Sequence, residues 1–118
     1  MLCQLSHPNI IRIFGQYTKN ENNLFLVLEL GIQSLRDLLV SQSPGRLPFS
    51  QSLTFALHVS QGIMYLHSQD VIHLDIKSPN VIICDCGVAK ITDFGSARKM
   101  ITTTTQSTVG KAGCGRYT

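Results

Sequence analysis

Short apolar runs separated by polar turns divide the first third of the chain into strand-sized segments. Residues 10–14 read Ile-Ile-Arg-Ile-Phe and predict a strand, and the polar residues 19–23 that follow predict a turn. Residues 24–30 are almost continuously apolar, so we expect a second strand that is buried on both faces. Gly31 ends this run, and Ser34 is placed to cap a short leucine-rich helix.

The pattern then becomes helical and later extended. After a surface loop at residues 43–48, apolar residues recur at spacings of three and four and predict a long amphipathic helix. The stripe that we expect this helix to bury consists of Leu53, Ala56, Leu57, Ser60, Ile63, Met64 and His67. Two short apolar segments, 81–84 and 88–92, flank Cys86-Gly87 and predict a hairpin. Beyond Phe94 the chain is polar and rich in Thr and Gly, which predicts a mobile segment.

Composition places the chain among small globular domains. It has 118 residues, of which 43% are hydrophobic and 14% charged. The net charge is +3, but the basic residues are scattered, so we expect no nucleic-acid partner. No apolar run reaches the roughly 18 residues of a membrane span, so we expect no membrane partner either. The N-terminus has no secretory pattern and the four cysteines form no disulfide framework, so we expect reduced thiols and a cytoplasmic protein.

Two motifs carry the chemistry. Residues 73–80 read His-Leu-Asp-Ile-Lys-Ser-Pro-Asn, and Asp93-Phe94-Gly95 follows. Taken singly, Asp75 fits a turn, Asn80 fits a strand cap and Asp93 fits the start of another turn. Together they resemble the catalytic loop and the magnesium-binding motif of protein kinases.

The chain as a whole is similar to the middle of a eukaryotic protein kinase domain. The resemblance implies an α+β, two-lobed kinase fold of which only the central part is present. Residues 1–28 resemble the end of the small lobe, 29–33 the hinge, and 34–118 the first half of the large lobe through the activation segment. The family's Gly-rich loop, its strand lysine and the Glu partner of that lysine are not among these residues. We therefore expect the 118-residue chain by itself to be inactive.

The resemblance also implies ATP and Mg²⁺ as cofactors and a protein as the phosphate acceptor. Asp75 would take the proton of the substrate hydroxyl, and Lys77 would neutralise the transferring phosphoryl group. Asn80 and Asp93 would hold magnesium through oxygen atoms. His73 is expected to be a packed core residue.

Five further residues would bind the nucleotide if the resemblance holds. Leu28 would be the gatekeeper at the back of the ATP pocket, and the backbone of Glu29 and Gly31 would hydrogen-bond the adenine. Ile82 would form the floor of the adenine site. Asp37 stands where a ribose contact is often found, but it is equally well explained as a helix-surface carboxylate.

Departures from the family pattern indicate the subfamily. Leu74 replaces the usual Arg before the catalytic Asp, and Cys114 stands where a Thr is usual. With Glu-Leu-Gly at the hinge, His-Leu-Asp resembles the Mos serine/threonine kinases, which start the MAP kinase cascade in oocyte meiosis by phosphorylating MAP kinase kinases. Lys77 favours Ser or Thr over Tyr as acceptor. A mixed-lineage or other tyrosine-kinase-like MAP kinase kinase kinase remains an alternative, as does a truncated, non-catalytic module that binds nucleotide or a partner.

Overall fold

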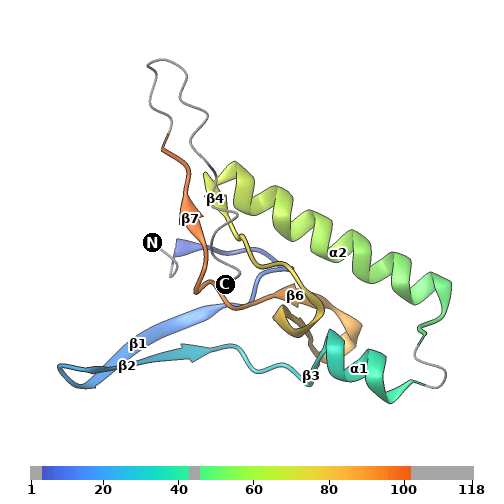
Figure 1. The fold of residues 1–118 in the computed structure, drawn as a ribbon, viewed down its shortest axis with the longest axis horizontal. Coiled ribbons are helices and arrows are strands. Elements are labelled where there is room, and N and C mark those ends of the chain that lie inside the picture. The colour runs from blue at the N-terminus through green and yellow to red at the C-terminus, as the bar shows by residue number, and fades with distance from the viewer. Residues whose placement is uncertain (1–3, 43–45, 102–118) are drawn as a thin grey trace.

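The structure is a computed structural model that describes residues 4–42 and 46–101 (Figure 1). Cys114 and most of the Thr- and Gly-rich segment lie outside the described residues. The elements are β1 (Ile13–Asn20), β2 (Asn23–Leu28), β3 (Gln33–Ser34), α1 (Leu35–Ser41), α2 (Phe49–Ser68), β4 (Val71–Ile72), the 3₁₀ turn η2 (Ser78–Asn80), β5 (Val81–Ile83), the 3₁₀ turn η3 (Asp85–Gly87), β6 (Ala89–Ile91) and β7 (Arg98–Lys99). This mixture of helices and antiparallel strands confirms the α+β class.

Strands β1 and β2 form an antiparallel ribbon that projects from the rest of the chain (Figure 1). The first strand begins at Ile13, later than predicted, and extends to Asn20, so the turn lies at residues 21–22, within the predicted range 19–23. Ile10 instead forms an isolated bridge with Ile91. The ladder runs from the pair Ile13–Leu28 to the pair Asn20–Asn23.

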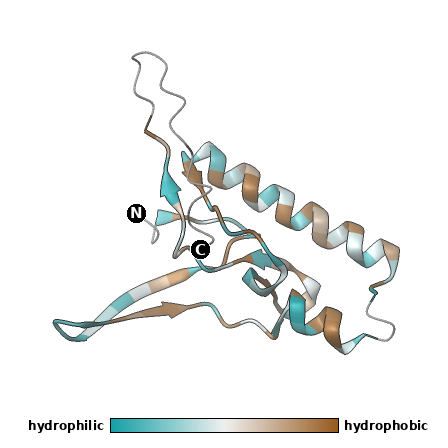
Figure 2. Cartoon of the chain, viewed as in Figure 1, coloured by the Kyte–Doolittle hydropathy of each residue, from teal (hydrophilic) through white to brown (hydrophobic). Residues whose placement is uncertain are grey.

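The predicted burial of the second strand is wrong. Every residue of β2 is exposed, and Figure 2 shows a hydrophobic strand standing clear of the helices. The physical reason is that β2 pairs with β1 alone, and among the described elements no helix or second sheet makes extensive contact with this two-stranded ribbon. An apolar run therefore predicted the strand correctly but not its surroundings.

The predicted hairpin at residues 81–92 is confirmed as β5 and β6, which form a three-stranded sheet with β3. Its turn contains Cys86 and Gly87, both with positive φ (65° and 73°). Cys84 is buried and Cys86 exposed, and both are free thiols. Burial raises the pKa of the Cys84 thiol above its ordinary value.

Helix α1 begins as predicted. The Ser34 hydroxyl oxygen accepts a hydrogen bond from the N–H of Asp37 at 3.0 Å and so caps the first turn. This cap places Asp37 at the N-terminal end of α1, directly after β3.

Helix α2 is the predicted long helix, but it buries a different face. Leu53 and Met64 of the predicted stripe are 59% and 69% exposed, whereas Phe55, Gly62 and Leu66 are buried. Both faces repeat at helical spacings, so hydropathy alone does not choose between them. The choice is made by contact with β4 and β6, against which α2 packs.

The core consists of two apolar clusters beneath α2. One contains Leu5, Ile10, Leu66, Val71 and Ile91. The other contains Phe55, Val81, Ile83 and Ala89. Within the described ranges, neither helix is long and apolar enough to cross a membrane.

A close approach between α2 and the segment before β1 depends on a glycine. A Cβ atom on Gly62 would lie 2.9 Å from the carbonyl oxygen of Asn9 and 2.9 Å from Cδ1 of Ile91. Asn9 is buried, and its side-chain amide donates to the carbonyl of Ala89 at 3.1 Å. The carbonyl of Asn9 in turn accepts from the N–H of Ile91 at 2.8 Å. This contact anchors the chain that leads into β1 onto the sheet that carries the candidate site.

Candidate functional site

His73 connects the two segments that carry the motifs. Its Nδ1 accepts from the N–H of Asp75 at 3.1 Å, so the ring proton is assigned to Nε2, which donates to the carbonyl of Thr92 at 2.8 Å. The ring meets Phe94 edge-on, with centroids 5.2 Å apart. His73 is 2% exposed, which confirms the prediction of a packed core histidine.

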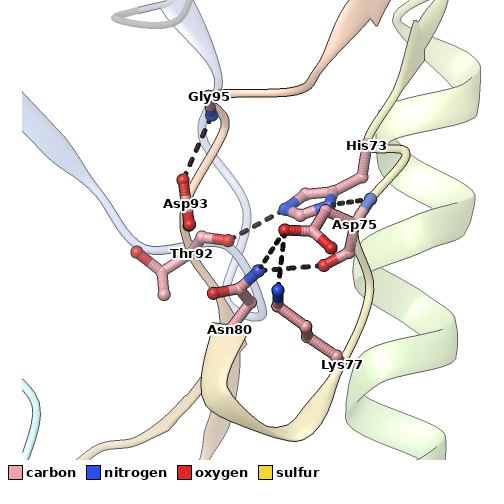
Figure 3. Close-up of polar contacts among 7 residues, drawn as sticks. All are labelled: His73, Asp75, Lys77, Asn80, Thr92, Asp93 and Gly95. Carbon is pink, nitrogen blue, oxygen red and sulfur yellow. Dashed lines mark hydrogen bonds and ion pairs between the residues drawn. The ribbon is translucent and has the colours of Figure 1, made fainter. Parts of the chain in front are cut away.

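Asp75 lies at the centre of the polar contacts in Figure 3. The Asn80 amide nitrogen donates to the Asp75 carbonyl at 2.9 Å and to its Oδ2 at 3.0 Å. Lys77 Nζ lies 3.3 Å from the same Oδ2. The other carboxylate oxygen, Oδ1, is buried and has no hydrogen-bond partner among the described residues. An unpaired buried oxygen is costly, so Oδ1 is an unsatisfied acceptor within this cluster.

The loop between β4 and β5 reaches this geometry by two tight turns. Leu74 has a left-handed backbone, with φ of 67°. Pro79 then stands in the 3₁₀ turn η2, where its fixed φ is favourable, and the N–H of Asn80 donates to the carbonyl of Lys77 at 2.9 Å. This turn places the Asn80 side-chain amide within hydrogen-bond distance of Asp75.

Asn80 and Asp93 are brought close together through Thr92. The N–H of Thr92 donates to the Asn80 carbonyl at 2.9 Å, and Figure 3 shows Thr92 lying between Asn80 and Asp93. Asp93 has φ of 60°, a left-handed conformation that Asp tolerates better than most residues. Its Oδ1 accepts from the N–H of Gly95 at 3.2 Å.

These residues fit a magnesium ion. An amide oxygen on Asn80 and a carboxylate on Asp93 are the hard oxygen donors that Mg²⁺ prefers.

The predicted nucleotide-binding residues line one cavity of about 350 Å³. All five are present in its lining: Leu28, Glu29, Gly31, Asp37 and Ile82. A Cβ on Gly31 would lie 1.9 Å from Cγ2 of Ile82, so the chain after β2 lies directly against this side chain. Asp37 lines this cavity, and its backbone N–H also donates to the Ser34 cap of α1.

A second cavity, of about 440 Å³, lies on the side of Asp93 and Phe94. Ile11, Leu28 and Thr92 line both cavities. The space beside the predicted nucleotide-binding residues therefore adjoins the space beside the predicted metal ligand.

The side chains of Glu29 and Lys90 were not predicted to interact. Glu29 Oε1 forms a short ion pair with Nζ of Lys90, and Glu29 Oε2 accepts from the N–H of Arg12 at 3.1 Å. Burial raises the pKa of Glu29, but the hydrogen bonds and charges of Lys90 and Arg12 outweigh it and hold the pKa below its ordinary value. Because 61 positions separate Glu29 from Lys90, no local spacing indicates this pair.

Comparison with known proteins decides the family. The family model described as protein kinase domain matches residues 1–114. The chain belongs to the protein kinase domain family. A kinase chain in the crystal structure of the yeast RNA Pol II CTD kinase CTDK-1 complex superposes with a TM-score of 0.75 at 31% identity, over 86% of this chain and 33% of that one. The fold is therefore the central part of the two-lobed kinase fold.

The relatives are diverse kinases. A probable serine/threonine-protein kinase of Dictyostelium discoideum is 39% identical over 102 residues, or 86% of this chain and 16% of that protein. The tyrosine-protein kinase csk-1 of Caenorhabditis elegans is 35% identical over 91% of this chain and 20% of its own length. Mitogen-activated protein kinase kinase kinase 5 of Arabidopsis thaliana is 33% identical over 85% of this chain. The chain spans 14–20% of the length of these three relatives.

Proposed function

We propose that this chain carries the catalytic centre of a serine/threonine protein kinase. The observation on which this rests is the environment of Asp75: Asn80 and Lys77 hold one carboxylate oxygen, and the other is buried and unpaired. In this proposal the Asp75 carboxylate accepts the hydrogen bond of the substrate hydroxyl and takes its proton as the phosphoryl group is transferred. The Asn80 amide keeps the carboxylate from rotating, so Asp75 holds one orientation.

Lys77 supplies positive charge beside the reacting groups. Its side chain is 54% exposed, whereas that of Asp75 is 15% exposed, so the ammonium group lies on the open side of the pair. From there it neutralises the transferring phosphoryl group without being buried itself.

ATP and Mg²⁺ are the proposed cofactors. Magnesium, when bound, neutralises charge on the phosphate oxygens, and Asn80 and Asp93 would hold it. Leu28 would lie at the back of the pocket and Ile82 on its floor, and the backbone of Glu29 and Gly31 would hydrogen-bond the adenine. Asp37 would face the ribose, and all five residues line the cavity of about 350 Å³. In the same proposal residues 1–28 end the small lobe, residues 29–33 form the hinge, and residues 34–118 begin the large lobe.

We further propose a Mos-like MAP kinase kinase kinase that acts in the cytoplasm during oocyte meiosis and has a MAP kinase kinase as its protein substrate. Leu74 before Asp75 and the hinge sequence Glu29-Leu30-Gly31 support this subfamily. The mixed-lineage and other tyrosine-kinase-like MAP kinase kinase kinases are the second candidate. Residues 75–80 suit them equally, and the similarity to the Arabidopsis kinase supports the same level of the cascade.

The test is phosphate transfer by the full protein that carries this chain. Radiolabelled ATP is supplied with an inactive MAP kinase kinase, with and without Mg²⁺, and the labelled amino acids are identified. We expect magnesium-dependent label on Ser or Thr that is lost in Asp75→Asn. Label on Tyr would contradict the serine/threonine assignment. Nucleotide binding without any transfer would favour the truncated, non-catalytic module.

A further inference from the structure

Arg12 and Glu29 lie directly beyond the last pair of the β1–β2 ladder, Ile13–Leu28, and are joined irregularly. The N–H of Glu29 donates to the carbonyl of Arg12 at 2.8 Å, as in a regular hydrogen-bonded pair. In a regular antiparallel pair the second bond would run from the N–H of Arg12 to the carbonyl of Glu29. Here the N–H of Arg12 donates instead to Oε2 of the Glu29 side chain, at 3.1 Å.

This substitution releases the backbone carbonyl of Glu29 from the ladder. The side chain of Glu29 occupies the donor that its own carbonyl would otherwise engage. Glu29 lines the cavity of about 350 Å³ together with Leu28 and Gly31. A carbonyl freed from the ladder at this point is available to a hydrogen-bond donor on a ligand in that cavity.

Lys90 holds the substituting carboxylate in place. Its ammonium group, on β6, pairs with the second oxygen of Glu29, so both carboxylate oxygens are engaged. The two side chains are only 17% and 26% exposed, which limits competition from water. A Glu side chain without this partner has several rotamers that point to solvent.

We propose that Lys90 is a positioning residue that determines base specificity: it keeps the Glu29 carboxylate on the N–H of Arg12 and so leaves the Glu29 carbonyl free to accept the amino group of adenine. This inference rests on the proposed function, because it assumes that the cavity holds ATP. When Lys90 is absent, the Glu29 carboxylate turns away from the N–H of Arg12. This N–H then donates to the Glu29 carbonyl, which extends the ladder by one regular pair. The acceptor for the adenine amino group is then lost, while the apolar contacts to the base remain.

The experiment compares two nucleotides on the full protein. ATP carries the 6-amino group, and purine riboside 5′-triphosphate lacks it but has the same ring, ribose and phosphates. Dissociation constants are measured by displacement of a fluorescent ATP analogue from the wild type, Lys90→Met and Lys90→Arg. Lys99→Met is the matched control, since Lys99 is an exposed lysine on β7, away from the cavity.

The wild type is expected to prefer ATP, and Lys90→Met should weaken ATP binding by about 3- to 10-fold, the range of one lost hydrogen bond. Binding of the amino-free nucleotide should change by less than about twofold. Lys90→Arg should restore most of the preference, and Lys99→Met should leave both constants unchanged. Glu29→Ala should lose the preference as Lys90→Met does, and the double variant should lose no more than either single variant.

Equal weakening of both nucleotides in Lys90→Met would mean a general structural role and would overturn the inference. So would an unchanged preference for ATP in Lys90→Met, or no preference in the wild type. If Lys90→Met does not fold, retention of the ATP preference in Glu29→Ala contradicts the inference in the same way. A wild-type protein that binds neither nucleotide would overturn both the proposed function and this inference. The other outcomes overturn only the role of Lys90.

Discussion

The amide of Asn80 holds Asp75 at two points, donating to its backbone carbonyl at 2.9 Å and to its Oδ2 at 3.0 Å. Rotation of the Asp75 side chain would break one of these bonds and the contact with Lys77. The carboxylate is thus held in one orientation, with Oδ2 on the two donors and Oδ1 buried without a hydrogen-bond partner among the described residues.

Asp75→Asn removes the proposed proton acceptor while keeping the size of the side chain. We expect turnover of the full protein to fall by about 10² to 10⁴, the usual contribution of a general base. The measurement is the initial rate of phosphate transfer at saturating ATP. Asp70→Asn is the matched control, because Asp70 is an exposed Asp five positions before Asp75 in the sequence. Near-wild-type turnover in Asp75→Asn would remove Asp75 from the mechanism.

Asp93→Asn tests the magnesium assignment without adding backbone strain. Asn adopts the positive φ of residue 93 as readily as Asp does, whereas Ala does not. Loss of the negative charge should raise the Mg²⁺ concentration for half-maximal activity by at least about tenfold. Asp93→Ala should abolish activity. A magnesium titration that superimposes on that of the wild type would show that Asp93 is not a ligand.

Gly62→Ala should destabilise the fold even though Ala is the better helix former. The added Cβ would lie 2.9 Å from the Asn9 carbonyl, a backbone atom that is held by its hydrogen bond to Ile91. We expect overpacking to lower the free energy of unfolding by about 1 to 3 kcal/mol. The better helix propensity of Ala offsets about 1 kcal/mol of this loss. Denaturant unfolding of the full protein measures the change.

Gly15→Ala is the control for that substitution. No atom lies within 4 Å of a Cβ built at Gly15 in β1. Its free energy of unfolding should stay within about 0.5 kcal/mol of the wild type. Equal losses in the Gly15 and Gly62 variants would show that the close approach to Asn9 has no special cost.

The pKa of Glu29 predicts a specific pH dependence. Because the pKa is lowered in the folded state, the carboxylate stabilises the fold above its unfolded pKa, near 4.5, and this stability is lost as the pH falls through the folded value. The stability difference between the wild type and Glu29→Gln should therefore be largest near neutral pH, under about 1 kcal/mol for this partly exposed pair, and should shrink below pH 4.5. Paired denaturation curves at several pH values measure it, and a difference that grows on acidification would contradict the prediction.

Features that depend on residues close together in the sequence were predictable. Ser34 caps α1 because its hydroxyl needs only a donor three residues on. The turn at Cys86 and Gly87 forms between two short apolar segments, as their spacing indicates. The clustering of Asp75, Lys77 and Asn80 likewise follows from six consecutive positions in one tight loop.

Features that depend on distant partners were not predictable. The exposure of β2 depends on what packs against it, and the buried face of α2 depends on β4 and β6 rather than on its own hydropathy. Strands β4 and β7 are two residues long, too short for any periodicity to indicate them. The ion pair between Glu29 and Lys90 was not predictable either, because charged residues in a sequence are equally well explained as solvent-exposed side chains.

The backbone of Thr92 is bonded at both of its polar groups by the loop that carries Asp75: its N–H by Asn80 and its carbonyl by His73. Any rearrangement of Asp93 and Phe94 therefore pivots about a fixed point immediately before them. The torsions that change must lie at residue 93 and beyond, while the catalytic loop keeps its shape. In hydrogen exchange, the amide of Thr92 should remain protected in states in which the amide of Gly95 exchanges freely. Motion of the segment after Thr92 therefore leaves the loop that holds Asp75 in place.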